Sequence, residues 1–126
     1  MKERAYAFFN EAIKKVNEAN EELCRPEEDV VTYSVCKNAQ FAIENYLRGF
    51  LLNNNVDPSS YNTIDSLYKE CKTINKKFEE IDLTDFSCKS HEIGSKYCNQ
   101  VTKVSNCFDI ADNLDTFFRR EKFINK

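Results

Sequence analysis

The sequence predicts an all-α protein folded as an up-and-down four-helix bundle, and two observations lead to this class. Apolar residues recur at three- and four-residue steps along most of the chain, which is the spacing of one face of a helix. Glycine and proline number two each, too few for the many tight turns of an all-β protein. The length of 126 residues suits a single domain, residues 1–126, that can bury a core without disulfides or metal.

The first two helices are expected over residues 3–24 and 26–53. Pro26 followed by three acidic residues is typical of a helix start, because proline lacks only an N–H that would be unpaired there and acids favour the positive end of the helix dipole. A run of three asparagines from Asn53 ends the pattern. The second helix is apolar over most of its circumference, so we expect other helices and a second copy of the protein to cover it.

The third helix is expected to begin at Asn62, which with Asp65 resembles a reciprocal N-cap. Its apolar residues continue in four-three alternation through Phe78 to Ile81. After this the periodicity weakens, and residues 82–100 form either a short extra helix or an irregular crossover before the last helix, residues 101–120. Short connections between the first three helices favour antiparallel neighbours.

Charge and cysteine usage exclude several classes of protein. The formal net charge of −3 and the pI near 5.3 argue against nucleic-acid binding by bulk charge. No apolar run approaches the roughly 20 residues that span a bilayer, so we expect a cytoplasmic protein with no membrane partner. The six cysteines form no Cys-x-x-Cys pair and there is one histidine, so no metal and no cofactor are expected. Cys71 and Cys107 lie on apolar stripes as small hydrophobic residues.

Residues 34–52 carry a more specific pattern, in which a face of small residues and glutamine is followed by a glutamate and a basic residue in helical phase. The positions that form it are Gln40, Ala42, Glu44, Leu47, Arg48 and Gly49. This order resembles the second helix of the HEPN family, the higher-eukaryote and prokaryote nucleotide-binding domain. The resemblance is close over residues 34–75 and extends to helix number and length elsewhere.

The resemblance implies a binding module with one of two kinds of partner. One is a nucleotide or RNA, and the other is a minimal nucleotidyltransferase encoded as a companion in the manner of toxin–antitoxin pairs. It also implies a homodimer, built on the second helix and part of the last. The implied ligand- or partner-binding residues are Gln40, Glu44, Arg48 and Asn62. Asn45 stands where the family usually has lysine, and Asn62 where it usually has histidine, so part of the family's binding function is expected to be lost.

Glu44 and Arg48 admit a second interpretation that needs no ligand. They are four residues apart, so they could form an exposed helical ion pair that contributes only a few tenths of a kcal/mol. Because the surrounding helix is so apolar, a buried or interfacial charge there would instead require a partner. The sequence leaves both interpretations open.

Many HEPN proteins are metal-independent ribonucleases that use an arginine followed, after four to six residues, by a histidine. No arginine of this chain has a histidine at that spacing, and the corresponding positions before His91 are Thr84, Asp85 and Phe86. We therefore expect a non-catalytic module. Two alternatives stay open, a ribonuclease with a divergent site around His91 and Lys89, and a purely structural assembly subunit. The basic residues at the end of the last helix are weaker candidates for contacts with phosphate or nucleic acid: Arg119, Arg120 and Lys122.

Overall fold

The computed structural model of the chain describes residues 2–25, 32–83 and 101–123. The described chain is built from four α-helices and two short 3₁₀ helices. In order these are α1 (Lys2–Leu23), α2 (Thr32–Asn53), η2 (Pro58–Ser60), α3 (Ile64–Ile74), η3 (Lys76–Glu80) and α4 (Val101–Arg120). Since none of the described residues lies in a β-strand, the predicted all-α fold is confirmed.

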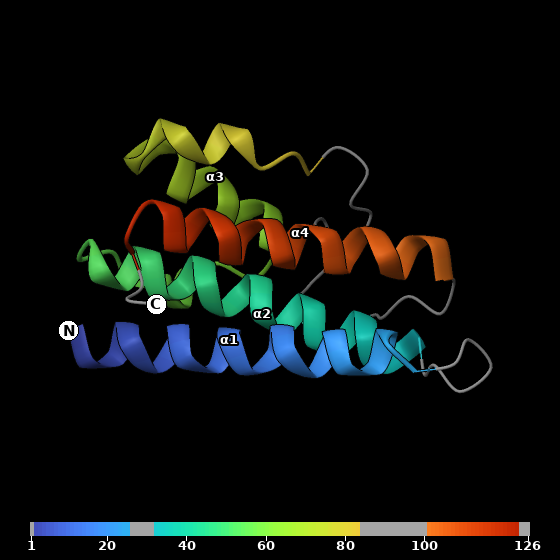
Figure 1. The fold of residues 1–126 in the computed structure, drawn as a ribbon. Helices are drawn as coiled ribbons and strands as arrows, with labels where there is room; N and C mark the ends of the chain where they lie inside the picture. Colours follow the sequence, from blue (N-terminus) through green and yellow to red (C-terminus); the bar gives the residue numbers. More distant parts are fainter. Residues whose placement is uncertain (1, 26–31, 84–100, 124–126) are drawn as a thin grey trace.

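The helix α2 occupies the middle of the bundle. It lies between α1 and α4, runs antiparallel to α1, and is the helix that contacts each of the other three (Figure 1). Its buried residues are spread around its circumference: Val35, Cys36, Ala39, Gln40, Ala42, Ile43, Tyr46, Leu47, Phe50, Leu51 and Leu52. A helix of this composition has to be covered on several sides, and the bundle supplies that cover.

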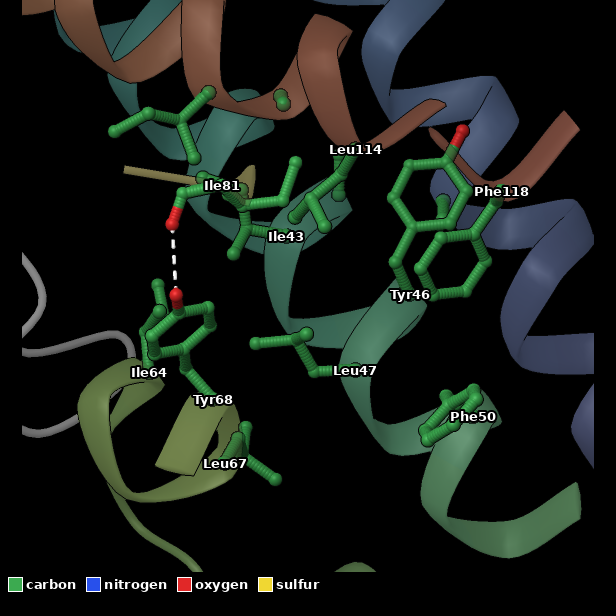
Figure 2. Packing of buried hydrophobic residues seen from close by; sticks show 14 of the residues in the cluster. Ile43, Tyr46, Leu47, Phe50, Ile64, Leu67, Tyr68, Ile81, Leu114 and Phe118 are labelled. Carbon is green, nitrogen blue, oxygen red and sulfur yellow. Dashed lines mark hydrogen bonds between the residues drawn. The ribbon is translucent and has the colours of Figure 1, made fainter. Parts of the chain in front are cut away.

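An aromatic group at one end of the bundle joins α2, η3 and α4. Tyr46 lies beside Phe118 in Figure 2, with ring centroids 4.9 Å apart. The Phe50 ring packs on Phe78 of η3 at 4.7 Å, and Phe78 packs on Phe117 of α4 at 4.9 Å. The last two pairs are edge-to-face, and such pairs contribute roughly 0.5–1.5 kcal/mol each beyond the area they bury.

The third helix is shorter than its apolar periodicity predicts. It ends at Ile74, and Asn75 is extended, with φ −141° and ψ 109°. The Asn75 side chain accepts a hydrogen bond from the Lys77 N–H at 3.0 Å, which starts η3. Asparagine offers the backbone this local alternative to a helical bond, so the prediction that one helix continues through Phe78 and Ile81 is wrong, although both residues are buried.

The N-cap of α3 is Thr63, one residue after the predicted one. Thr63 Oγ1 accepts from the Ser66 N–H at 3.0 Å, and the Thr63 N–H donates to Ser66 Oγ at 3.3 Å. This reciprocal pair is a capping box, so the predicted pairing of Asn62 with Asp65 is wrong. Asn62 is exposed and precedes the cap.

Some predicted features lie outside the described residues. These are the start of the second helix at Pro26, the short extra helix or crossover before α4, and the residues His91 and Lys89. Two of the predicted helix ends agree with the structure closely, Asn53 for α2 and Arg120 for α4. Cys71 and Cys107 are buried, as their place on apolar stripes predicts.

Candidate binding site

Glu44 and Arg48 form an ion pair that is mostly shielded from solvent. Arg48 Nε donates to Glu44 Oε2 at 2.8 Å, and the side chains are 15% and 20% exposed for Arg48 and Glu44. Their spacing of four residues places them on adjacent turns of α2. The pair is therefore not the exposed one that the alternative interpretation assumed.

The rest of the Arg48 guanidinium fastens the loop after α2. Nη1 donates to the Pro58 carbonyl at 2.6 Å and Nη2 to the Tyr61 carbonyl at 3.0 Å. Pro58 is the first residue of the short helix η2 and Tyr61 directly follows it, so one side chain fixes both ends of this turn to α2. Hydrogen bonds with a charged donor are stronger than neutral ones, about 1.5–3 kcal/mol in net terms.

The other two predicted site residues, Gln40 and Asn62, differ from this ion pair in how exposed they are to solvent. Gln40 is fully buried in the core, where its Nε2 donates to Cys36 Sγ at 3.1 Å. Asn62 is exposed and directly follows Tyr61, whose carbonyl Arg48 holds. The structure thus brings Glu44, Arg48 and the Asn62 loop together, and it places Gln40 in the interior.

Two hollows lie beside α1 and share the side chain of Arg4. The first, of about 400 Å³, lies between α1 and α2 and is lined by Arg4, Ala7, Phe8, Glu11 and Asn45. The second, of about 450 Å³, reaches the η2 loop and is lined by Arg4, Leu52, Asn55, Asp57 and Ser59. Arg4 could not be singled out from the sequence, because it occupies a solvent-facing position of an ordinary amphipathic helix.

The loop wall of the second hollow carries a negative charge. The Ser59 N–H donates to Asp57 Oδ1 at 3.0 Å, and this bond, together with the Ser59 side chain and the positive charge of Arg4, holds the pKa of Asp57 below its usual range. Arg4 itself forms no ion pair within the part of the chain that the structure describes. Each hollow thus combines this arginine with a carboxylate, Glu11 in the first and Asp57 in the second.

Carboxylates neutralise the two arginines at the end of α4. Arg119 Nε donates to Asp115 Oδ2 at 2.9 Å. Arg120 Nη2 donates to both carboxylate oxygens of Glu80, at 2.7 and 2.8 Å, and this contact raises the pKa of Arg120. Lys122, the third weaker candidate, is exposed and has a positive φ of 63°.

Asp115 also joins α4 to α2. The hydroxyl of buried Tyr46 donates to Asp115 Oδ1, and Arg119 donates to the other carboxylate oxygen. Burial raises the pKa of Tyr46, and the hydrogen bond to Asp115 raises it further. This network has a structural use, since it satisfies a buried hydroxyl between two helices.

The comparisons with curated proteins and with solved structures gave no match. A family model described as the HEPN domain matches residues 5–120, which include all four α-helices except the first residues of α1. The chain belongs to the HEPN family. The resemblance found in residues 34–52 is thereby confirmed, and membership indicates a nucleotide- or RNA-related function at the level of the family.

The described part of this HEPN chain carries neither a membrane-spanning helix nor a metal-binding group of side chains. Of its helices, none is both long and apolar enough to cross a bilayer. Within residues 2–25, 32–83 and 101–123, which do not include His91, no group of three cysteine, aspartate or glutamate side chains could hold a metal ion.

Proposed function

We propose that this HEPN protein is a non-catalytic binding module whose partner is a protein, a minimal nucleotidyltransferase in a toxin–antitoxin-like pair. The observation that carries the proposal is that three of its five arginines pair closely with its own carboxylates, Arg48 with Glu44, Arg119 with Asp115 and Arg120 with Glu80. Affinity for RNA depends on basic side chains that neutralise phosphates. A nucleotidyltransferase partner would instead supply the nucleotide chemistry itself.

The charge distribution around the two hollows favours a protein over a polyanion. Arg4 is accompanied by Glu11 in one hollow and by Asp57 in the other, and such carboxylates repel a phosphate backbone. A protein surface can match both signs at once, which gives specificity and orientation. The proposed contacts are Asn62, the η2 loop that Arg48 fastens, and the Glu44–Arg48 pair. Gln40 is buried in the core, so its proposed role is to hold α2 in place behind these contacts and not to touch the partner.

The sequence supports the proposed catalytic status, domain organisation, location and oligomeric state of the protein. The absence of the arginine–histidine motif supports a non-catalytic protein, and the whole of residues 1–126 is proposed to be one HEPN domain that works in the cytoplasm as a homodimer. A divergent ribonuclease around His91 and Lys89, nucleotide or RNA binding, and a purely structural subunit are the outcomes that the experiments must separate.

Co-expression tests the partner directly. The chain is produced with a minimal nucleotidyltransferase from the same genome, and co-purification through a tag on either protein is expected. Asn62→Arg adds bulk and charge at an exposed loop position and should weaken the complex at least about tenfold. Asn113→Arg, an equal change at an exposed position of α4, serves as the matched control and should leave the complex intact.

Nucleotide and RNA assays test the alternatives. We expect no cleavage of mixed single-stranded RNA in chelator, no salt-sensitive RNA binding, and no rise in Tm with a panel of nucleotides, because a ligand of the folded state must stabilise it. RNA cleavage that His91→Ala abolishes would establish the ribonuclease. A rise in Tm with one nucleotide would establish nucleotide binding, and flat responses without co-purification would leave the structural subunit.

A further inference from the structure

The hollow between α1 and α2 has a largely apolar floor with opposite charges at its two ends. Ala7 is exposed and Phe8 is half-buried, and they lie between Arg4 and Glu11 along α1. Seven residues span about two turns, roughly 10 Å along the axis, so Arg4 and Glu11 project from the same side of the helix. An exposed apolar hollow with such a rim is typical of a contact surface.

This arrangement is self-complementary under two-fold symmetry. A two-fold axis that passes between Ala7 and Phe8 would place a second α1 antiparallel across the first. Arg4 would then face Glu11 of the partner subunit, and Glu11 would face Arg4 of the partner subunit. An isologous interface requires this reciprocity, in which each contact occurs twice.

The two charges are only weakly engaged within the subunit. Arg4 lies near the Asp57 carboxylate but forms no ion pair with it or with another described residue, and the contact of Glu11 with Lys15 is long, at 3.9 Å. Lys15 has a closer carboxylate in Glu18, at 3.5 Å. Transfer of Glu11 to a partner's arginine would therefore leave Lys15 with an acidic neighbour.

We propose that a second copy of this chain docks on the α1–α2 hollow, with Phe8 of each subunit buried at the centre and two Arg4–Glu11 ion pairs at the rim. This inference rests on the homodimer of the proposed function and names its interface. Asn45 lines the hollow from α2, so α2 contributes to the interface as the family resemblance implied. The second contributing helix is α1, where the resemblance implied the last helix.

Charge reversal at the two rim positions gives a sharp test. Arg4→Glu alone places carboxylates opposite each other at both ion pairs, and Glu11→Arg alone does the same with guanidinium groups. A mixture of the two single variants restores both pairs as opposite charges, and so does the double variant Arg4→Glu/Glu11→Arg. Light scattering after size exclusion, with one variant carrying a mass tag, distinguishes monomers, homodimers and mixed dimers.

We expect the wild type to be dimeric and each single variant to dissociate, with a Kd raised at least about tenfold. The mixture should form mixed dimers and the double variant should form homodimers. High salt should weaken these differences because it screens rim charges. The matched control reverses Lys14 and Glu21, which have the same spacing on α1, are exposed, and do not line the hollow. Circular dichroism checks that every variant remains helical.

Two results would overturn the inference, and they are distinguishable. A dimer that persists in both single variants, with no preference for mixed dimers, would place the homodimer interface elsewhere and leave the proposed homodimer standing. A wild type that is monomeric at every concentration would remove both the interface and the homodimer, and co-purification with the nucleotidyltransferase would still report separately on the proposed partner.

Discussion

The backbone of Gly49 lies directly against the ring of Phe9. A β-carbon built on Gly49 would be 2.6 Å from Phe9 Cε1 and 2.8 Å from Cδ1, far inside normal contact distance. The ring has little room to move, because Phe9 is buried and packs edge-on against Phe118 with centroids 5.7 Å apart. The small residue at this position of α2 therefore sets how closely α1 approaches.

Gly49→Ala should destabilise the protein even though alanine is the better helix former. The helix propensity gained is about 1 kcal/mol, and the clash with Phe9 should cost up to about 3 kcal/mol, so the expected net loss of stability is up to about 2 kcal/mol. Urea denaturation measures the change. Phe9→Leu in the same chain should relieve part of the cost, which a double-mutant cycle detects as coupling. A Gly49→Ala protein as stable as the wild type would contradict this account.

Arg48→Lys should loosen the loop after α2. A lysine ammonium cannot reach Glu44, Pro58 and Tyr61 together in the geometry of the guanidinium, so the free energy of unfolding should fall by about 1–3 kcal/mol. Hydrogen exchange at residues 57–61 should rise. Lys69→Ala is the control, because its pair with Asp65 is exposed and should change stability by less than about 0.5 kcal/mol. Unchanged exchange in the loop would refute the role of Arg48.

The cap of α3 can be located by substitution. Thr63→Ala removes the side-chain acceptor of the Ser66 N–H and should cost about 0.5–2 kcal/mol. Asn62→Ala, one residue earlier, should change stability by less than about 0.5 kcal/mol because Asn62 is exposed and caps nothing. Thermal denaturation of the two variants compares the positions directly. The opposite ranking would mean that the helix begins where the sequence pattern predicted.

Tyr46 should make the protein sensitive to alkali. Its pKa in the folded protein is raised above the usual value of 10.0, so its contribution to stability is complete below about pH 10 and is lost at higher pH as the unfolded chain ionises. Tyr46→Phe should make the alkaline fall in stability shallower and should cost about 1–2 kcal/mol at neutral pH. Urea denaturation at several pH values measures both effects. Tyr6→Phe, at an exposed tyrosine, should leave the pH profile unchanged.

Apolar periodicity predicted the helical class and the central place of α2, because a helix that is apolar on most sides can be satisfied only inside a bundle. It failed at Asn75 for a physical reason. The spacing of Phe78 and Ile81 continues the stripe of α3, but the backbone has already left the helix, and Phe78 is buried by Phe50 and Phe117. Burial of this kind is set by tertiary contacts, which spacing along the chain does not report.

The sequence predicted Glu44, Arg48 and Asn62 of the candidate site, but not the contacts that hold the loop or the hollows beside α1. The helical phase of Glu44 and Arg48 identified them, but the other acceptors of Arg48 are backbone carbonyls, which carry no signal of residue type. Arg4 and Asn45 meet at one hollow through the crossing of α1 and α2. Arg4 belongs to no motif, and Asn45 was noted only as the residue that replaces a family lysine, so the sequence did not show that the two lie close together.

The central position of α2 also has a consequence during synthesis. Tyr46 reaches its partner Asp115 only when a segment 69 residues further along has been translated. Until α4 emerges from the ribosome, the side of α2 that α4 will cover is exposed to water. This side includes the apolar residue Phe50. Such surfaces are prone to aggregate or to recruit chaperones. The nascent chain is therefore protected from aggregation only after α4 has packed on α2.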